Sequence, residues 1–221
     1  MKRARTPRAA GCAVPARPLK LLYQFPLPEP HTVWNTIQLG NEETHVYKQQ
    51  HGESCGPSSV LMLMRQIDGT LTAEAMVRLW FSIAEKAVNK SGGKAWGAKA
   101  GRDERIFDFS GGAGLDIIIQ VLNSKRPSYH AKSGGRMGDM SPTSPGIVRV
   151  QWPDTGGHFI VCLGSGYSAG TEKRRVYLDP WYGMVHNRHD IYPLYDTASG
   201  SFGEGAATGK ITHLVTTAPT P

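Results

Sequence analysis

The sequence has few cysteines and no long apolar stretch. Its 221 residues contain three cysteines, Cys12, Cys55 and Cys162. A small, odd number of this kind does not build a disulfide framework, so we expect free thiols and reducing conditions where the protein acts. No apolar run approaches the ~18 residues that a transmembrane helix needs. These absences exclude a small disulfide-stapled scaffold and disfavour a helical membrane protein.

Acidic residues are outnumbered by basic ones, which gives a formal net charge of +7. Part of the excess lies in a Pro/Ala-rich start that lacks the apolar core of a Sec signal peptide. We expect residues 1–31 to form a basic, flexible tail, with a delivery or docking segment as the alternative. No aromatic-interleaved basic patch, RNP-like block or zinc-finger spacing accompanies this charge. A nucleic-acid-binding protein is therefore an alternative that rests on charge alone.

The remaining chain suits one domain, expected at residues 32–221, because 39% of the residues are hydrophobic and a sizeable core is possible. Periodicity and turn residues predict an early strand or extended arm over 34–47 and then helices at 56–67, about 72–88 and 114–123. The second helix is expected to bury most of its apolar residues, Met76 and Ile83 included. Strands are expected at 129–132, 146–152, 158–163, 174–178, 191–194 and 210–217. Helices first and strands later indicate an α+β fold with an antiparallel sheet.

Cys55 lies at the junction between a polar, turn-prone loop, Gln49 to Ser54, and an apolar helical run that begins at Val60. The unpaired N–H groups and the dipole at a helix N-terminus favour an anion, and the thiolate is the nucleophilic form of cysteine. Pro57 suits the first helical turn, and Ser54 is a candidate cap. Most free cysteines are small buried hydrophobes, but this position favours a reactive thiol.

A candidate base and a candidate orienting group follow later in the chain. His158 opens an apolar, β-prone run after a glycine pair, which predicts the start of a buried strand. Asp179 ends a short β-prone run, which Pro180 stops. If the two strands form a hairpin, the Asp179 carboxylate can fix the tautomer of His158 and stabilise its protonated form. Taken singly, the two residues have ordinary interpretations: a core histidine with one hydrogen bond and an Asp-Pro turn.

The order and local sequence of these motifs resemble the papain-like cysteine peptidases, in particular their C39-like and AvrRpt2-like bacterial branches. In those families a glutamine lies six residues before the nucleophile, as Gln49 does here, and Gly-Pro and a helix follow the nucleophile. The Gly-His segment at His158 and the Asp-Pro-x-x-Gly block at Asp179 are also similar. The similarity covers about Trp34 to Pro193 by pattern and is specific only in these three blocks.

The resemblance implies a papain-like fold, in which an N-terminal helical half and a C-terminal antiparallel sheet hold the active site in the cleft between them. It implies that Cys55 is the nucleophile, that His158 is the general base and then acid, and that Asp179 orients His158. The side chain of Gln49 and the backbone N–H of Cys55 would form the oxyanion hole, with Gln50 as a rival donor. The activity implied is hydrolysis of peptide bonds by a cysteine peptidase.

Other functions stay open on the sequence alone. The same residues would serve a deamidase or an acyltransferase, and a papain-like binding module without activity is a third possibility. We expect a protein or peptide substrate, no nucleic acid and no transmembrane segment. The expected location is cytoplasmic, or secreted without a Sec signal as a translocated bacterial effector. No cofactor or metal is expected, since the nearest metal-binding pattern, His186-x-x-His189-Asp190, lacks a full set of ligands.

Overall fold

The structure is a computed structural model that describes the chain in segments. They are residues 33–39, 42–51, 54–90, 114–126, 128–152, 157–165, 174–181, 183–189, 194–196 and 208–219. The tail expected at residues 1–31 lies outside these segments, so its predicted character stays a prediction.

Within the described residues, a β-hairpin precedes the helices, and most strands follow them. The hairpin strands are β1 (Trp34–Leu39) and β2 (Glu42–Tyr47), and the helices are α1 (Cys55–Asp68), α2 (Glu74–Lys90) and α3 (Leu115–Lys125). The later elements are β3 (Tyr129–Ser133), a 3-10 turn (Met137–Asp139), β4 (Gly146–Gln151), β5 (Gly157–Cys162), β6 (Arg174–Asp179), β7 (Met184–His189), β8 (Leu194–Asp196) and β9 (Thr208–Pro219). The predicted α+β class is confirmed.

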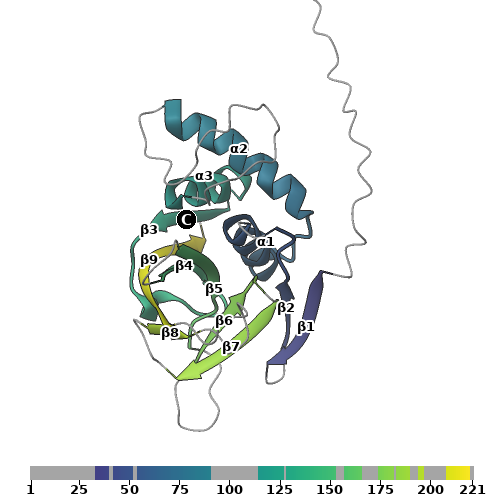
Figure 1. The fold of residues 1–221 in the computed structure, drawn as a ribbon, viewed down its shortest axis with the longest axis vertical. Helices are drawn as coiled ribbons and strands as arrows, with labels where there is room; N and C mark the ends of the chain where they lie inside the picture. Colours follow the sequence, from purple (N-terminus) through teal and green to yellow (C-terminus); the bar gives the residue numbers. More distant parts are fainter. Residues whose placement is uncertain are drawn as a thin grey trace, which may run out of the picture.

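The strands of the described segments form two antiparallel sheets. β1 pairs with β2, while the larger sheet has the order β3-β9-β4-β5-β6-β7, with β8 added on β9. Figure 1 shows α2 and α3 together at one end of the molecule, with α3 next to β3, α1 below α2, and the β1–β2 hairpin beside α1. Contacts of α1 with β5, β2 and α2 agree with this arrangement. The helix that begins at Cys55 is therefore central.

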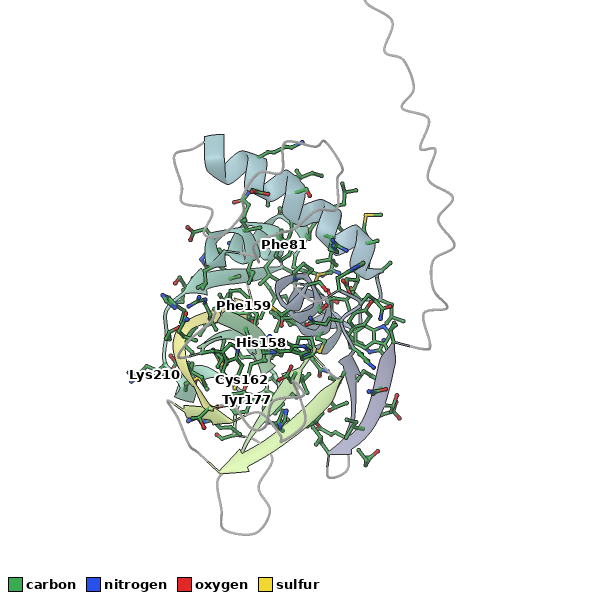
Figure 2. The ribbon with its side chains drawn as sticks, in the orientation of Figure 1. Phe81, His158, Phe159, Cys162, Tyr177 and Lys210 are labelled. Atoms are coloured by element: carbon green, nitrogen blue, oxygen red, sulfur yellow. The ribbon has the colours of Figure 1, made fainter. Side chains whose placement is uncertain are left out.

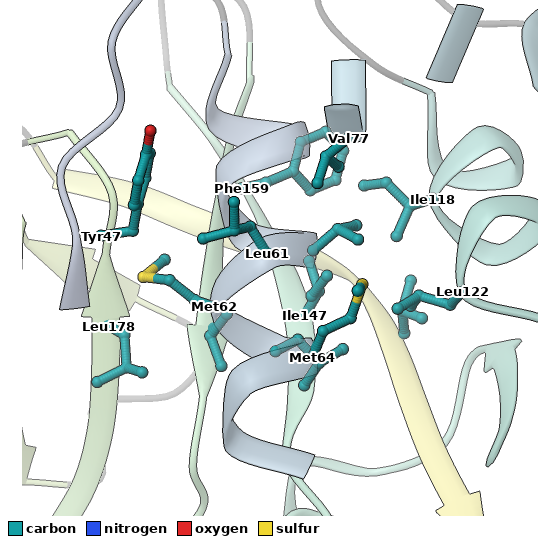
Figure 3. Packing of buried hydrophobic residues seen from close by; sticks show 14 of the residues in the cluster. Tyr47, Leu61, Met62, Met64, Val77, Ile118, Leu122, Ile147, Phe159 and Leu178 are labelled. Carbon is teal, nitrogen blue, oxygen red and sulfur yellow. The ribbon is translucent and has the colours of Figure 1, made fainter. Parts of the chain in front are cut away.

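The core is built around α1. Five consecutive residues of this helix have no exposed surface: Val60, Leu61, Met62, Leu63 and Met64. Figure 3 shows side chains of the sheet, α2 and α3 gathered around this helix. A helix apolar over a full turn is stable only where other elements cover every side. The start of α1 is thereby held in a fixed place relative to the sheet.

The second helix buries a narrower face than the sequence predicts. Val77, Phe81 and Ala84 are buried, whereas Met76 is 43% and Ile83 is 58% exposed. At 3.6 residues per turn, the three buried positions share one face, and Met76 and Ile83 lie beside it. The expectation that both would be largely buried is wrong, because their apolar character does not change their angular position on the helix.

One strand after Asp179 was not predicted. β7 begins at Met184 and pairs with β6 along its whole length. The strand expected at 191–194 is a separate prediction, of which only Leu194, the first residue of β8, lies within the described residues. β7 is polar in sequence, and its residue Val185 contacts the core while His186, next to it, is also buried. The sequence of β7 therefore lacks the alternation of polar and apolar residues that predicts a strand. Its strand conformation follows from pairing with β6.

Candidate active site

Cys55 is the first residue of α1, and its side chain is buried, with 8% exposure. Ser54 occupies the N-cap position, but its hydroxyl makes no capping bond to the helix. The hydroxyl donates to the His51 carbonyl at 2.9 Å and accepts from the His51 N–H at 3.3 Å. The expectation that the Ser54 side chain caps α1 is wrong, because the turn at His51 uses that oxygen.

A buried serine of α1 connects this helix to the strand of the candidate base. The Ser59 hydroxyl donates to the backbone carbonyl of Phe159 at 2.9 Å, and both groups are buried. Ser59 lies one helical turn beyond Cys55, and Phe159 adjoins His158. This bond sets the axial position of α1 against β5, and with it the position of the thiol near the imidazole.

The strand pairing that would bring His158 and Asp179 together is present, since β5 and β6 pair antiparallel. Cα partners in the sheet are Val150 with His158, Cys162 with Tyr177, and Tyr177 with His186. Because side chains alternate along strands, His158, Asp179 and His186 project on the same face of the sheet. Figure 2 shows His158 together with Cys162 and Tyr177, which belong to that face.

His158 and Asp179 meet directly. The Nε2 atom of His158 lies 2.8 Å from Oδ1 of Asp179, with side-chain exposures of 2% and 6%. The same Oδ1 accepts the backbone N–H of Trp181 at 2.9 Å. Asp179 therefore both starts the Asp-Pro turn and contacts the histidine, so the two interpretations of this residue are compatible.

The pKa of the His158 imidazole is raised well above its ordinary value, which favours the protonated ring. Burial of the ring opposes its charge and lowers the pKa. The negative charge of Asp179, its hydrogen bond, and a hydrogen bond and charge interaction with Cys55 outweigh burial and raise the pKa of His158 to about 10. Asp179 occupies Nε2, which leaves Nδ1 as the ring nitrogen for the thiol. A cysteine, a protonated histidine and a carboxylate thus form one continuous chain of contacts.

Two tryptophans flank the histidine ring. The Trp181 ring centroid lies 4.8 Å from that of His158 at an interplanar angle of 47°, and the Trp152 centroid lies at 6.3 Å and 22°. These aromatic faces shield the His158–Asp179 contact from water, and a lower local dielectric strengthens it. Neither tryptophan was singled out from the sequence, because only the fold brings both beside His158.

Gln49 is buried, whereas the rival donor Gln50 is exposed. The backbone N–H of Gln49 donates to the Pro180 carbonyl at 2.8 Å, which connects it to the Asp179 turn. Its side-chain Nε2 donates to the His51 carbonyl at 2.8 Å, a bond that uses one of the two amide hydrogens. The Gln50 side chain donates to Lys48 on the surface. Burial and connectivity favour Gln49 as the donor of the two.

His186 lies near the second oxygen of Asp179 and not in a metal set. Its Nε2 atom is 4.0 Å from Oδ2 of Asp179, and its side chain is 6% exposed. Within the described part of the chain, no group of three or more His, Cys, Asp and Glu side chains is placed to hold a metal ion. Asp190, the third member of the sequence pattern, lies outside the described residues.

No protein-family model and no curated protein matches this chain. Among the described helices, none combines the length and the apolar character needed to cross a membrane. A functional assignment for this chain therefore depends on its residues and their geometry.

Proposed function

We propose that this chain is a papain-like cysteine peptidase that hydrolyses peptide bonds of a protein or peptide substrate. The observation that carries the proposal is the buried series Cys55, His158 and Asp179, in which His158 lies 2.8 Å from Asp179 and interaction with Cys55 contributes to the raised pKa of His158. A nucleophile in contact with a base, and a base in contact with a carboxylate, is the arrangement of nucleophilic acyl transfer. The three residues come from three different elements, so local sequence alone does not account for their meeting.

The arrangement of elements supports the papain-like part of the proposal. The nucleophile begins a central helix, α1, and the base and orienting residue lie on neighbouring antiparallel strands, β5 and β6. Helical residues precede the sheet along the described chain, apart from the β1–β2 hairpin. This order of elements supports the division between a helical half and a sheet half that the resemblance implies.

In the proposed reaction, the Cys55 thiolate attacks the carbonyl carbon of the scissile bond, and the carbonyl electrons move to oxygen. The Cys55 N–H and the Gln49 side chain stabilise that oxyanion, each donor contributing about 2.7–4 kcal/mol to the transition state. Protonated His158 gives its proton to the departing amine. Water then attacks the acyl-enzyme, with His158 now accepting a proton, and the thiolate leaves.

The charge state of His158 suits this sequence of steps. A histidine with a pKa raised to about 10 is protonated at neutral pH. It is therefore ready to act as the acid for amine departure, and its positive charge favours a thiolate partner. Asp179 stabilises this imidazolium without receiving its proton.

The test is incubation of the purified full chain with a peptide library, followed by mass spectrometry of the products. Wild type is compared with Cys55→Ala and His158→Ala, and Cys162→Ala serves as the control because Cys162 is a fully buried thiol. New peptide termini that require Cys55 and His158 but persist in Cys162→Ala support a peptidase. Conversion of glutamine to glutamate, or acyl addition, would instead indicate a deamidase or a transferase. Products that persist equally in Cys55→Ala would overturn the proposal.

A further inference from the structure

Glu74 is a buried carboxylate beside the connection that carries Gln49. It is the first residue of α2 and is only 4% exposed. A carboxylate removed from water costs free energy unless hydrogen bonds compensate. The positive end of the α2 dipole supplies part of that compensation. Hydrogen-bond donors from other elements supply further compensation at Oε2.

The donors to Glu74 belong to the segment between β2 and α1 and to the elements on both sides of it. The Gln50 backbone N–H donates to Oε2 of Glu74 at 2.9 Å, and the Ser58 hydroxyl approaches the same oxygen at 3.4 Å. At the end of β2, burial together with the charge of Glu74 and a hydrogen bond to it raises the pKa of Tyr47. One carboxylate thus contacts the end of β2, the following loop and the first turn of α1.

These contacts hold Gln49 from one side, and the Asp179 turn holds it from the other. Gln50, the next residue, is bonded to Glu74, while the Gln49 N–H is bonded to the Pro180 carbonyl. Ser58 lies within one helical turn of Cys55 on α1. Glu74 therefore connects the backbone next to Gln49 with α1, the helix that begins at Cys55.

We propose that Glu74 is a positioning residue that fixes the Gln49 loop relative to Cys55, so that the oxyanion donor is in place before substrate binds. The inference rests on the proposed acyl-transfer function and adds the residue that organises its oxyanion hole. Hydrogen-bond donors of an oxyanion hole are most effective when they are already in place, because they then stabilise the negative charge of the transition state without having to move. The proposed effect of Glu74 is indirect, through its bonds to the Gln50 backbone and the Ser58 hydroxyl.

The test compares two reagents that use the same thiol. p-Nitrophenyl acetate acylates Cys55 through a tetrahedral oxyanion, whereas iodoacetamide alkylates it by displacement without one. The test variant is Glu74→Asp, which keeps the charge at the start of α2 but is one carbon too short to reach Gln50. Glu85→Asp is the matched control, since Glu85 is partly buried on the same helix and lies about 16 Å further along its axis.

We expect Glu74→Asp to slow acylation at least tenfold, and at most by the ~10²–10³-fold loss that follows removal of an oxyanion donor, and to leave alkylation unchanged. Glu74→Gln, whose amide oxygen can still accept the Gln50 N–H, should recover most of the acylation rate. In a Gln49→Ala background, Glu74→Asp should cause little further loss, because residues that act through one another are not additive.

Three results with Glu74→Asp would overturn the positioning role. They are equal slowing of both reagents, acylation by Glu74→Asp at the wild-type rate, or full additivity with Gln49→Ala. Failure of the proposed function gives a different result, namely acylation of wild type that does not depend on Cys55 and His158. Thermal unfolding of each variant identifies any loss of fold, and Glu74→Gln then decides the question, since a folded Glu74→Gln variant with slow acylation also contradicts the inference.

Discussion

Asp179 accepts two hydrogen bonds at one oxygen, from the His158 ring and from the Trp181 backbone. At the residue scale, this makes a single carboxylate responsible for the shape of the turn and for the charge of the histidine. The two roles are separable in principle. An asparagine keeps an oxygen for the Trp181 N–H but has no negative charge to hold a proton on His158.

Replacing Asp179 with Asn should therefore lower the pKa of His158 below its wild-type value of about 10, because the negative charge of Asp179 is the largest of the interactions that raise it. Titration of isotope-labelled histidine rings by NMR measures this directly. Asp139→Asn is the control, since Asp139 pairs with Arg136 on the surface and lies outside the site. An unchanged His158 titration in Asp179→Asn would show that the carboxylate does not set the charge of the ring.

At the scale of elements, the site depends on how α1, the β2–α1 loop and the β6–β7 turn are held together. The Ser59–Phe159 bond joins α1 to β5. The Lys48 and Gln49 N–H groups donate to the Val33 and Pro180 carbonyls. The Asn35 side chain donates to the Gly183 carbonyl at 2.9 Å. The β1–β2 hairpin therefore contributes to the site by supporting the turn that carries Asp179.

Ser59→Ala should destabilise the fold by about 1–3 kcal/mol, because it leaves the buried Phe159 carbonyl without this donor. Urea unfolding followed by fluorescence gives the free energy of unfolding. The exposed Ser124 of α3, which donates to Val121 of its own helix, provides the control, and Ser124→Ala should stay within about 0.5 kcal/mol of wild type. Equal losses in the two variants would argue against a special role for the bond between α1 and β5.

Gly183→Ala should be more damaging than Gly69→Ala. Both glycines have left-handed backbone, with φ of +64° and +72°, which costs a non-glycine residue roughly 1–2 kcal/mol. A Cβ at Gly69 would meet nothing within 4 Å, but one at Gly183 would lie 2.7 Å from Asn35 Nδ2 and 3.1 Å from Lys48 Cβ. Thermal unfolding should therefore show a larger drop for Gly183→Ala, and similar drops would mean that the turn adapts freely.

On the scale of the whole molecule, the charge of His158 links folding to pH. The folded-state pKa of about 10 is above the ~6.5 of an unperturbed histidine. Protonation of His158 thus stabilises the fold fully below about pH 6.5, and this stabilisation disappears as the pH rises through about 10.

The difference in free energy of unfolding between wild type and Asp179→Asn should therefore be largest near pH 6 and should shrink steadily toward pH 10. Urea unfolding of both proteins across this range gives the difference, in which other titrations common to the two proteins cancel. A difference that grows with pH would contradict the assignment of a protonated His158 to the folded state.

The sequence predicted the elements whose signals are local. Gly69 ends α1 in a left-handed conformation, as a glycine after an apolar helical run indicates. The β5 and β6 strands were predicted within a residue or two, since apolar runs bounded by glycine and proline define them. β7 was missed because its polar sequence contains no such pattern, and its strand conformation follows from pairing with β6. Exposure of Met76 and Ile83 was missed because apolar composition does not specify a helix face.

For the candidate site, the sequence by itself determined which residue types are present and in what order: a cysteine at a helix start, a histidine at a strand start and an aspartate at a strand end. Only the tertiary structure decided that His158 and Asp179 lie 2.8 Å apart, that two tryptophans flank the ring, and that Glu74 holds the Gln50 backbone. The physical reason is the separation along the chain of the residues that interact. Helix and strand boundaries depend on neighbours a few positions away, whereas contacts between distant segments depend on how the whole core is packed.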